Sequence, residues 1–423
     1  MTAALLLVSV PFLTALALAA LRSEALAERI DRWVVTLALP AAIGLAAWSG
    51  GLDQLGLLSA GLVWVTAALT RWGGTVAEDG PGSAARALDQ VVLGGLLLVC
   101  MVAGGTHGVA VWAAVVVVVG ASVLRGGEGV ATTIPPLPLR AWAAKRTEVG
   151  GRGDPPPAGA AIPLPPSPSL KGRGGVDGGP RARPHATFQA AIPATGLILL
   201  LFGTITAPLD PPFGLGCQIV GLATLLALVP ALLPVALPLL LRLGAETGSP
   251  PLLATALVGL ALAAIAVPLR LLTAERGAVL GQMALAAAAI GLGSAGGSFA
   301  ALILLTLLTL SDAAARLSDP ARPVALLALA GLPPLGTFAG LALALPEIAR
   351  HEPLLLLVCL PGIALPAWWL IRGATIRRRI VQPALGWLPI GAVLLIGLLT
   401  PAPLTLWLRS ALPPAAMTAG PAP

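Results

Sequence analysis

The chain has 423 residues, of which 57% are hydrophobic and only 10% are charged, with a mean hydropathy of +0.93. Soluble domains carry about 25% charged residues, so this composition excludes a soluble protein and indicates a polytopic membrane protein. The net charge of +7 would suggest nucleic-acid binding in a soluble chain, but here arginine-rich cytoplasmic loops account for it. We expect a lipid bilayer and no nucleic acid among its partners, and a multi-pass location in the inner (plasma) membrane.

The first 124 residues form an N-terminal membrane block of five predicted spans. A span needs roughly 20 apolar residues, and the candidates are about 2–21, 33–50, 54–70, 91–105 and 108–124. Arginines follow the first, third and fifth spans. The positive-inside rule then places the N-terminus outside and the segment after residue 124 in the cytoplasm.

Residues 125–187 differ in kind from the spans around them. They hold 12 Pro and 12 Gly, and 9 Lys and Arg against 4 Asp and Glu. Such a segment cannot bury enough apolar surface to offset the entropy of ordering it, so we predict a disordered cytoplasmic linker.

Residues 188–423 form a C-terminal membrane block with eight further candidate spans. They lie at about 188–207, 214–241, 250–272, 278–294, 297–315, 321–345, 353–371 and 384–408. If every candidate were one crossing, the basic loops of this block would lie on the opposite side of the membrane from those of the first block. One crossing is therefore missing or miscounted between residues 208 and 276. Either 214–241, which contains Pro230, Pro234 and Pro238, is not one simple span, or 250–272 is not a full crossing.

The stretch from Leu327 to Leu341 reads LALAGLPPLGTFAGL and is the most informative part of the chain. Its Gly and Pro residues interrupt an apolar run that is long enough to span a membrane. Proline removes a backbone donor, and a broken helix is tolerated at membrane depth only where protein or a wet cavity covers its backbone. Interrupted spans of this kind often mark transport sites. The broken-helix motif consists of Gly331, Pro333, Pro334, Gly336 and Phe338.

This motif resembles the G-x-P-P-x-x-G-F-x-x-K signature of the antiporter-like subunits of respiratory complex I, an NADH-quinone oxidoreductase. The same signature occurs in related membrane-bound hydrogenases and cation/proton antiporters. In that family the closing lysine lies on a broken helix and carries protons. Leu341 occupies its position here. The resemblance implies an all-α bundle of about 12–14 transmembrane helices, with inverted repeats that each contain a broken helix.

Two other stretches resemble the same family. Residues 251–270 follow its P-V-S-A-L-L pattern and place Leu262 where the family has a lysine. Residues 280–317 place Leu304 at a family histidine and Asp312 at a second lysine. In the family a further helix separates these two regions, and the short gap between them here suggests a lost helix. All three family lysine positions are therefore altered, to Leu262, Asp312 and Leu341.

Asp312 is the candidate proton-path residue, because ionisable side chains inside a bilayer are costly and mark functional paths by default. The competing interpretation is a helix-end residue paired with Arg316, four positions later. Asp53 also has a structural interpretation, as a carboxylate in the first turn of a span, where the helix dipole favours negative charge. Asp210 sits in a Pro-rich turn, and Glu347 marks the end of a span.

The sequence contains no catalytic constellation, and we expect no cofactor and no metal. The three cysteines are isolated in apolar runs, without a C-x-x-C pair or a Cys/His cluster. The first hypothesis is a non-catalytic membrane subunit of a proton-translocating, NADH-quinone oxidoreductase-like complex of the respiratory chain, with a degenerate proton channel and other membrane subunits as partners. The alternatives are a standalone secondary ion transporter or a structural membrane protein of unknown role.

Overall fold

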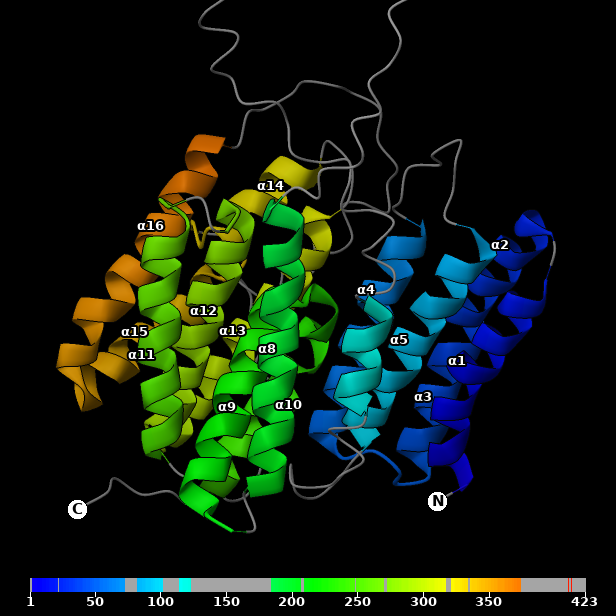
Figure 1. Cartoon of the computed structure of the whole chain (residues 1–423), viewed down its shortest axis with the longest axis horizontal. Coiled ribbons are helices and arrows are strands. Elements are labelled where there is room, and N and C mark those ends of the chain that lie inside the picture. Colours follow the sequence, from blue (N-terminus) through cyan, green and yellow to red (C-terminus); the bar gives the residue numbers. More distant parts are fainter. Residues whose placement is uncertain are drawn as a thin grey trace, which may run out of the picture.

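The computed structural model describes residues 2–21, 23–72, 82–101, 114–122, 184–206, 209–247, 249–269, 272–316, 321–333, 335–373, 410 and 412. Within these ranges the regular structure is helical throughout, which confirms the predicted all-α bundle (Figure 1). Most of the predicted linker 125–187 and the whole predicted span 384–408 lie outside the described residues. The helix that follows the linker begins at Pro184, inside the predicted linker boundary.

The N-terminal block is built from α1 (Thr2–Ala20), α2 (Glu24–Trp33), the π-helical turn η1 (Val34–Ala38), α3 (Leu39–Trp48), α4 (Gln54–Trp72) and α5 (Ser83–Met101). Residues 114–122 are also helical. The segments α2, η1 and α3 form one distorted span. Pro40 cannot donate to the helical ladder there, and the indole Nε1–H of Trp64 donates to the Val35 carbonyl at 3.0 Å, which satisfies an acceptor inside the π-helical turn.

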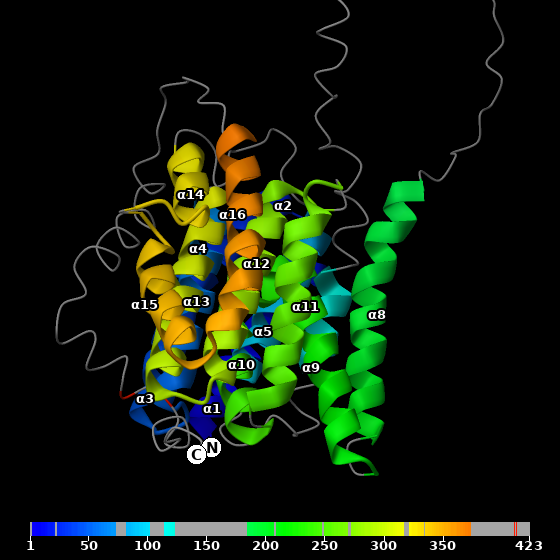
Figure 2. The same cartoon turned by 90° about the vertical axis from the view of Figure 1, so that its left-hand side faces the viewer.

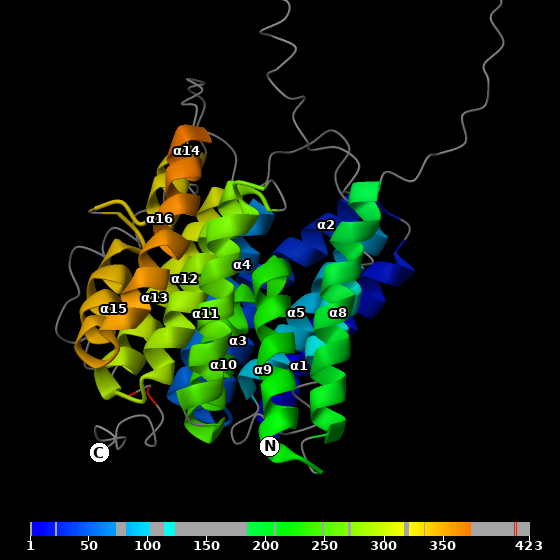
Figure 3. The same cartoon turned by 60° about the vertical axis from the view of Figure 1, so that its left-hand side comes forward.

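The C-terminal block begins with α8 (Pro184–Thr206), α9 (Pro211–Leu228), the 3₁₀ turn η2 (Pro230–Leu232), α10 (Leu233–Thr247) and α11 (Ser249–Ala266). It continues with α12 (Ala274–Gly291), α13 (Ala295–Ala315), α14 (Ala321–Leu329), α15 (Phe338–His351), the turn η3 (Pro353–Leu355) and α16 (Leu356–Gly373). The two blocks lie side by side along the long axis of the molecule (Figure 1). Helix α8 stands at one edge of the bundle (Figure 2) and packs against α9 (Figure 3).

Two helices, α9 and α10, occupy the stretch 214–241 that was counted as one span. Leu233, at the start of α10, accepts a hydrogen bond from the Thr309 hydroxyl at 3.4 Å, close to the C-terminal end of α13. The end of α10 leads directly into α11, whose Leu253 packs on Gly291 at the far end of α12. Helix α10 therefore runs back the way α9 came, and the chain makes two passes here. With this extra pass, the basic loops of both blocks fall on the same side of the membrane. The pattern of loop charges therefore does not require a lost helix.

Short polar side chains explain where several helices begin. The Asp53 carboxylate accepts the Gly56 N–H at 2.6 Å at the start of α4. Asp210, Thr273 and Ser294 accept backbone N–H groups in the same way ahead of α9, α12 and α13. Each satisfies a donor that has no partner within the helix. Asp53 and Asp210 are thus helix caps.

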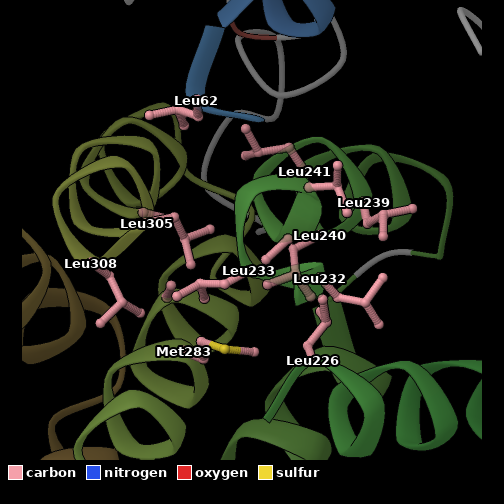
Figure 4. Close-up of a cluster of buried hydrophobic side chains, with 14 of the residues drawn as sticks. Leu62, Leu226, Leu232, Leu233, Leu239, Leu240, Leu241, Met283, Leu305 and Leu308 are labelled. Carbon is pink, nitrogen blue, oxygen red and sulfur yellow. The ribbon is translucent and has the colours of Figure 1, made fainter. Parts of the chain in front are cut away.

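Leucines from both blocks form the interior where the blocks meet (Figure 4). Leu62 of α4 faces leucines of α10 and α13, and Met283 of α12 lies in the same cluster. Burial of this apolar surface, together with α4–α10 and α4–α13 packing, joins the blocks into one continuous core.

Four of the described helices are long and apolar enough to cross a membrane: Glu24–Trp48, Ser83–Met101, Ala295–Ala315 and Pro353–Arg372. Shorter apolar helices occur at Leu6–Ala20, Thr195–Thr206, Gly216–Leu226 and Pro251–Ala266. Arginines gather at one end of this bundle, the end that the loop charges of the sequence lead us to expect in the cytoplasm. We call it the arginine end; it carries Arg71, Arg86, Arg276, Arg316 and Arg372.

Candidate functional site

The apolar stretch 321–345 is a broken helix in the structure. Helix α14 ends at Leu329 and α15 begins at Phe338, as the predicted fold requires. Gly331 and Gly336 adopt left-handed backbone conformations, with φ of 74° and 50°, which only glycine adopts without strain. Pro334 lies outside the described residues.

Protein groups cover the backbone of this break. The Gln282 side chain of α12, only 1% exposed, donates its amide to the Leu329 carbonyl at 2.5 Å. The fully buried Thr337 hydroxyl donates to the Ala328 carbonyl at 3.0 Å. The Gln282 contact gives the Leu329 carbonyl at the end of α14 a partner in an apolar interior. The Ala328 carbonyl also accepts the backbone N–H groups of Gly331 and Thr337, at 3.1 and 3.3 Å.

Leu341, at the family lysine position, fills the space beside this break. It is 7% exposed, and a Cβ added to Gly331 would lie 2.4 Å from its Cδ1 atom. Next to it, a Cβ on Gly340 would lie 2.5 Å from Cα of the fully buried Leu304. The break is therefore closely packed with aliphatic groups on this side.

The three positions that the resemblance aligns with family lysines do not converge in the structure. Leu262 is 52% exposed on α11 and faces outward from the bundle. Leu341 is buried between α14 and α13, and Asp312 lies two turns further along α13 than Leu304, at the arginine end. Phe338 is half-exposed at the start of α15.

Asp312 is 6% exposed and lies between two arginines. Its carboxylate pairs with Arg316 on the same helix, and with Arg276 at the start of α12 at 4.0 Å. The i,i+4 pair with Arg316, which the sequence offered as the competing interpretation, is thus present. Burial and the second arginine distinguish it from an ordinary solvent-exposed pair.

A second buried ionic centre lies in the N-terminal block, where the sequence analysis placed none. Arg71 at the end of α4 contacts Asp31 of α2 at 2.5 Å and Asp89 of α5 at 3.1 Å. Gln90 donates to Asp31 at 2.6 Å. Asp31, Asp89 and Gln90 are each at most 8% exposed. We call Asp31, Arg71, Asp89 and Gln90 the Arg71 centre.

This centre was not expected from the sequence, because the predicted spans leave its charged residues in loops. Helix α2 begins at Glu24 and α5 at Ser83, well before the predicted starts at 33 and 91. No Gly or Pro separates Ser83 from Val92. That uninterrupted run was the available signal that Asp89 continues the apolar helix.

A cavity of about 120 Å³ separates the Arg71 centre from Asp312. Its charged lining consists of Arg71 and Asp89 from one block and Asp312 and Arg316 from the other. Apolar side chains of α4, α5, α10 and α13 make up much of the remaining wall. Among the described residues, no group of three or more His, Cys, Asp or Glu is placed to hold a metal ion.

Comparison with known proteins gave matches by structure only. No sequence-family description and no curated protein matches the chain. A chain of the membrane-bound sulfane sulfur reductase, an archaeal respiratory membrane complex, superposes with a TM-score of 0.59 at 15% identity, covering 97% of each chain. The chain has the fold of respiratory membrane subunits.

Two structures of respiratory complex I from Thermus thermophilus contain chains of the same fold. The complex with bound aureothin gives a TM-score of 0.58 at 16% identity, covering 94% of this chain and 98% of the other. The complex with bound NADH gives 0.52 at 16% identity, covering 98% and 99%. The respiratory-subunit fold thus extends over both membrane blocks, including the N-terminal block that carries no recognisable motif.

Proposed function

We propose that the chain is a membrane subunit of an NADH-quinone oxidoreductase-like, proton-translocating complex of the inner (plasma) membrane, and that its own proton channel is degenerate. The first part is supported by the fold, which matches respiratory subunits over nearly the whole length of each chain. In such a complex the chain would contact other membrane subunits and would scaffold them.

The distribution of buried charge carries the second part of the proposal. Among the described residues, the buried charged side chains are Asp31, Arg86, Asp89 and Asp312, and all four lie toward the arginine end. The broken helix, which would frame a path across the membrane, is packed with Leu341 and Leu304 instead. A proton relay needs ionisable groups or water in series, and the described side chains that contact one another at this break, Leu341, Leu304, Gln282 and Thr337, are not ionisable.

Purification in mild detergent tests the assignment to a complex. The tagged chain, extracted from its native membranes, is expected to elute with other polytopic subunits and with a quinone-reducing activity. Mass spectrometry and size-exclusion chromatography report the composition. Elution of the chain by itself, with cation/proton exchange activity after reconstitution into liposomes, would contradict the assignment and support a standalone transporter.

A further inference from the structure

We propose that Trp368 and Arg372, in the last turns of α16, bind the phosphate of an anionic phospholipid from the leaflet at the arginine end. The acyl chains of this lipid lie along the exposed apolar face of the same helix. The proposal goes beyond the assignment to a respiratory complex and does not depend on which complex the chain joins.

The outer face of α16 is apolar along its length and ends in a cation. Leu357, Leu360 and Trp368 are all exposed, the indole by 58%, and so is Arg372. Because these positions are separated by about one or two helical turns, they share one face of the helix. An apolar stripe with a guanidinium at one end matches the shape and polarity of a phospholipid, whose phosphate lies at the membrane surface above its chains.

Helix α11 widens this apolar face. It lies beside α16 (Figure 2), and a Cβ added to Gly362 of α16 would lie 2.8 Å from Cδ2 of Leu260 of α11. Both helices run toward the arginine end, so Trp368 lies at the level of the last turn of α11. Ile265 and Leu269, near that end of α11, are also exposed. An acyl chain therefore has apolar side chains of two helices to contact below the indole.

Trp368 holds the guanidinium of Arg372 without using its hydrogen-bond donors. The guanidinium carbon lies over the indole ring, 5.9 Å from the ring centroid, within the range of a cation–π interaction. Among the described residues no carboxylate pairs with Arg372, whereas Arg322 of α14 donates to Glu275 at 2.8 Å. The N–H groups of Arg372 thus remain available to a phosphate, which a guanidinium binds through two parallel hydrogen bonds.

Charge at the arginine end is divided unevenly between the two blocks. In the described part of the chain, the C-terminal block has four arginines there against two carboxylates, whereas the N-terminal block has four of each. The first set is Arg276, Arg316, Arg322 and Arg372 with Glu275 and Asp312, and the second is Arg29, Arg32, Arg71 and Arg86 with Glu24, Glu28, Asp31 and Asp89. The excess positive charge lies in the block that carries α16, where it attracts anionic headgroups.

The competing interpretation is an interfacial anchor that does not select among lipids, since Trp and Arg are common at membrane surfaces. The N-terminal block contains such an anchor for comparison. Trp33 is 63% exposed at the end of α2, but the neighbouring Arg32 pairs with Glu28. A paired arginine has less to offer a phosphate, so preference for anionic lipid distinguishes the two places.

Photo-crosslinking tests the site. The full chain, purified in its complex, is placed in phosphatidylcholine nanodiscs with a trace of phosphatidylglycerol that carries a diazirine in its acyl chain, and peptide mass spectrometry locates the crosslinks. We expect crosslinks on α16 between Leu357 and Trp368. Unlabelled phosphatidylglycerol should reduce them several-fold more than added phosphatidylcholine does, and inorganic phosphate should leave them unchanged.

Three variants assign the selectivity to the proposed residues. Arg372→Gln is expected to lower the α16 crosslinks about five-fold, the factor that corresponds to roughly 1 kcal/mol per arginine near an anionic surface. The matched control is Arg350→Gln, which removes an exposed arginine at the opposite end of the bundle and should leave the crosslinks unchanged. Trp368→Leu should also lower them, since leucine cannot hold the guanidinium.

Several results would overturn the proposal. Equal displacement by phosphatidylcholine, or the same preference for phosphatidylglycerol in crosslinks around Trp33, would reduce the site to an unselective anchor. Displacement by inorganic phosphate would assign it to a free anion. Unchanged crosslinks in Arg372→Gln would remove this arginine from lipid binding. A chain that elutes by itself would contradict the assignment to a complex, but its crosslinks would still test the lipid site.

Discussion

Replacing Arg71 with Met is expected to lower the free energy of unfolding by about 3–5 kcal/mol, the cost of leaving buried charges without their partner. Arg71 is the residue that contacts both Asp31 and Asp89, and its own side chain is 15% exposed. Methionine preserves most of the apolar stem of the side chain. The loss of unfolding free energy therefore measures the removal of the guanidinium group rather than a change in side-chain volume. Unfolding in mixed micelles titrated with sodium dodecyl sulfate measures the change.

Two further variants make this prediction specific. Arg322→Met removes a pair with Glu275 in which the arginine side chain is 50% exposed, and should cost about 0–1 kcal/mol. Combining Arg71→Met with Asp31→Asn and Asp89→Asn should recover most of the stability, because no buried charge is then left unpaired. If Arg71→Met cost no more than Arg322→Met, the Arg71 centre would not be a buried ionic centre.

Gly336→Val is expected to lower the free energy of unfolding by about 2–5 kcal/mol, the sum of left-handed backbone strain and overpacking. Gly336 has φ +50°, and a Cβ added there would lie 2.5 Å from Cβ and 2.7 Å from the carbonyl oxygen of Ala328. Those atoms belong to the end of α14, which the Thr337 hydroxyl also holds. The variant therefore pushes α14 and α15 apart at the break.

The matched control is Gly61→Ala in α4, where an added Cβ would meet nothing within 4 Å. Since this glycine is helical, the change is expected to alter stability by no more than about 1 kcal/mol. The amount of folded protein recovered in detergent and its unfolding curve distinguish the two. A Gly336→Val protein as stable as Gly61→Ala would show that the break is not closely packed.

Apolar length and the Gly/Pro pattern were enough to predict the helix class and the broken helix. The loop charges also located the error in the number of spans between residues 208 and 276. The positive-inside rule places basic loops on one side of the membrane, so a miscounted span moves the later loops to the wrong side. The loop charges could not choose between the two explanations of this error. The chain reverses direction inside the protein at Val229 and the Pro230–Leu232 turn. Because surrounding helices bury this turn, the sequence stays apolar through it and does not reveal the reversal.

The Arg71 centre was harder to predict, for a physical reason. Span prediction ends a helix where charge begins, but a charged residue can continue a buried helix when another helix supplies its counter-ion. Asp89 is paired with Arg71 across a gap of 18 positions in the chain, and Asp31 with Arg71 across 40. Such pairs depend on tertiary packing. By contrast, the Asp312–Arg316 pair follows from i,i+4 spacing alone and was visible in the sequence.

The proposal that this chain carries no working proton path is tested most directly by the proton-to-electron ratio of the reconstituted complex. The complex carrying Asp312→Asn is compared with the unaltered complex in liposomes, with electron transfer and proton uptake recorded together. We predict the same ratio in both, because the buried charged side chains among the described residues, Asp31, Arg86, Asp89 and Asp312, all lie toward the arginine end. A lower ratio at an unchanged rate of electron transfer would show that protons cross through this chain, and would contradict the account.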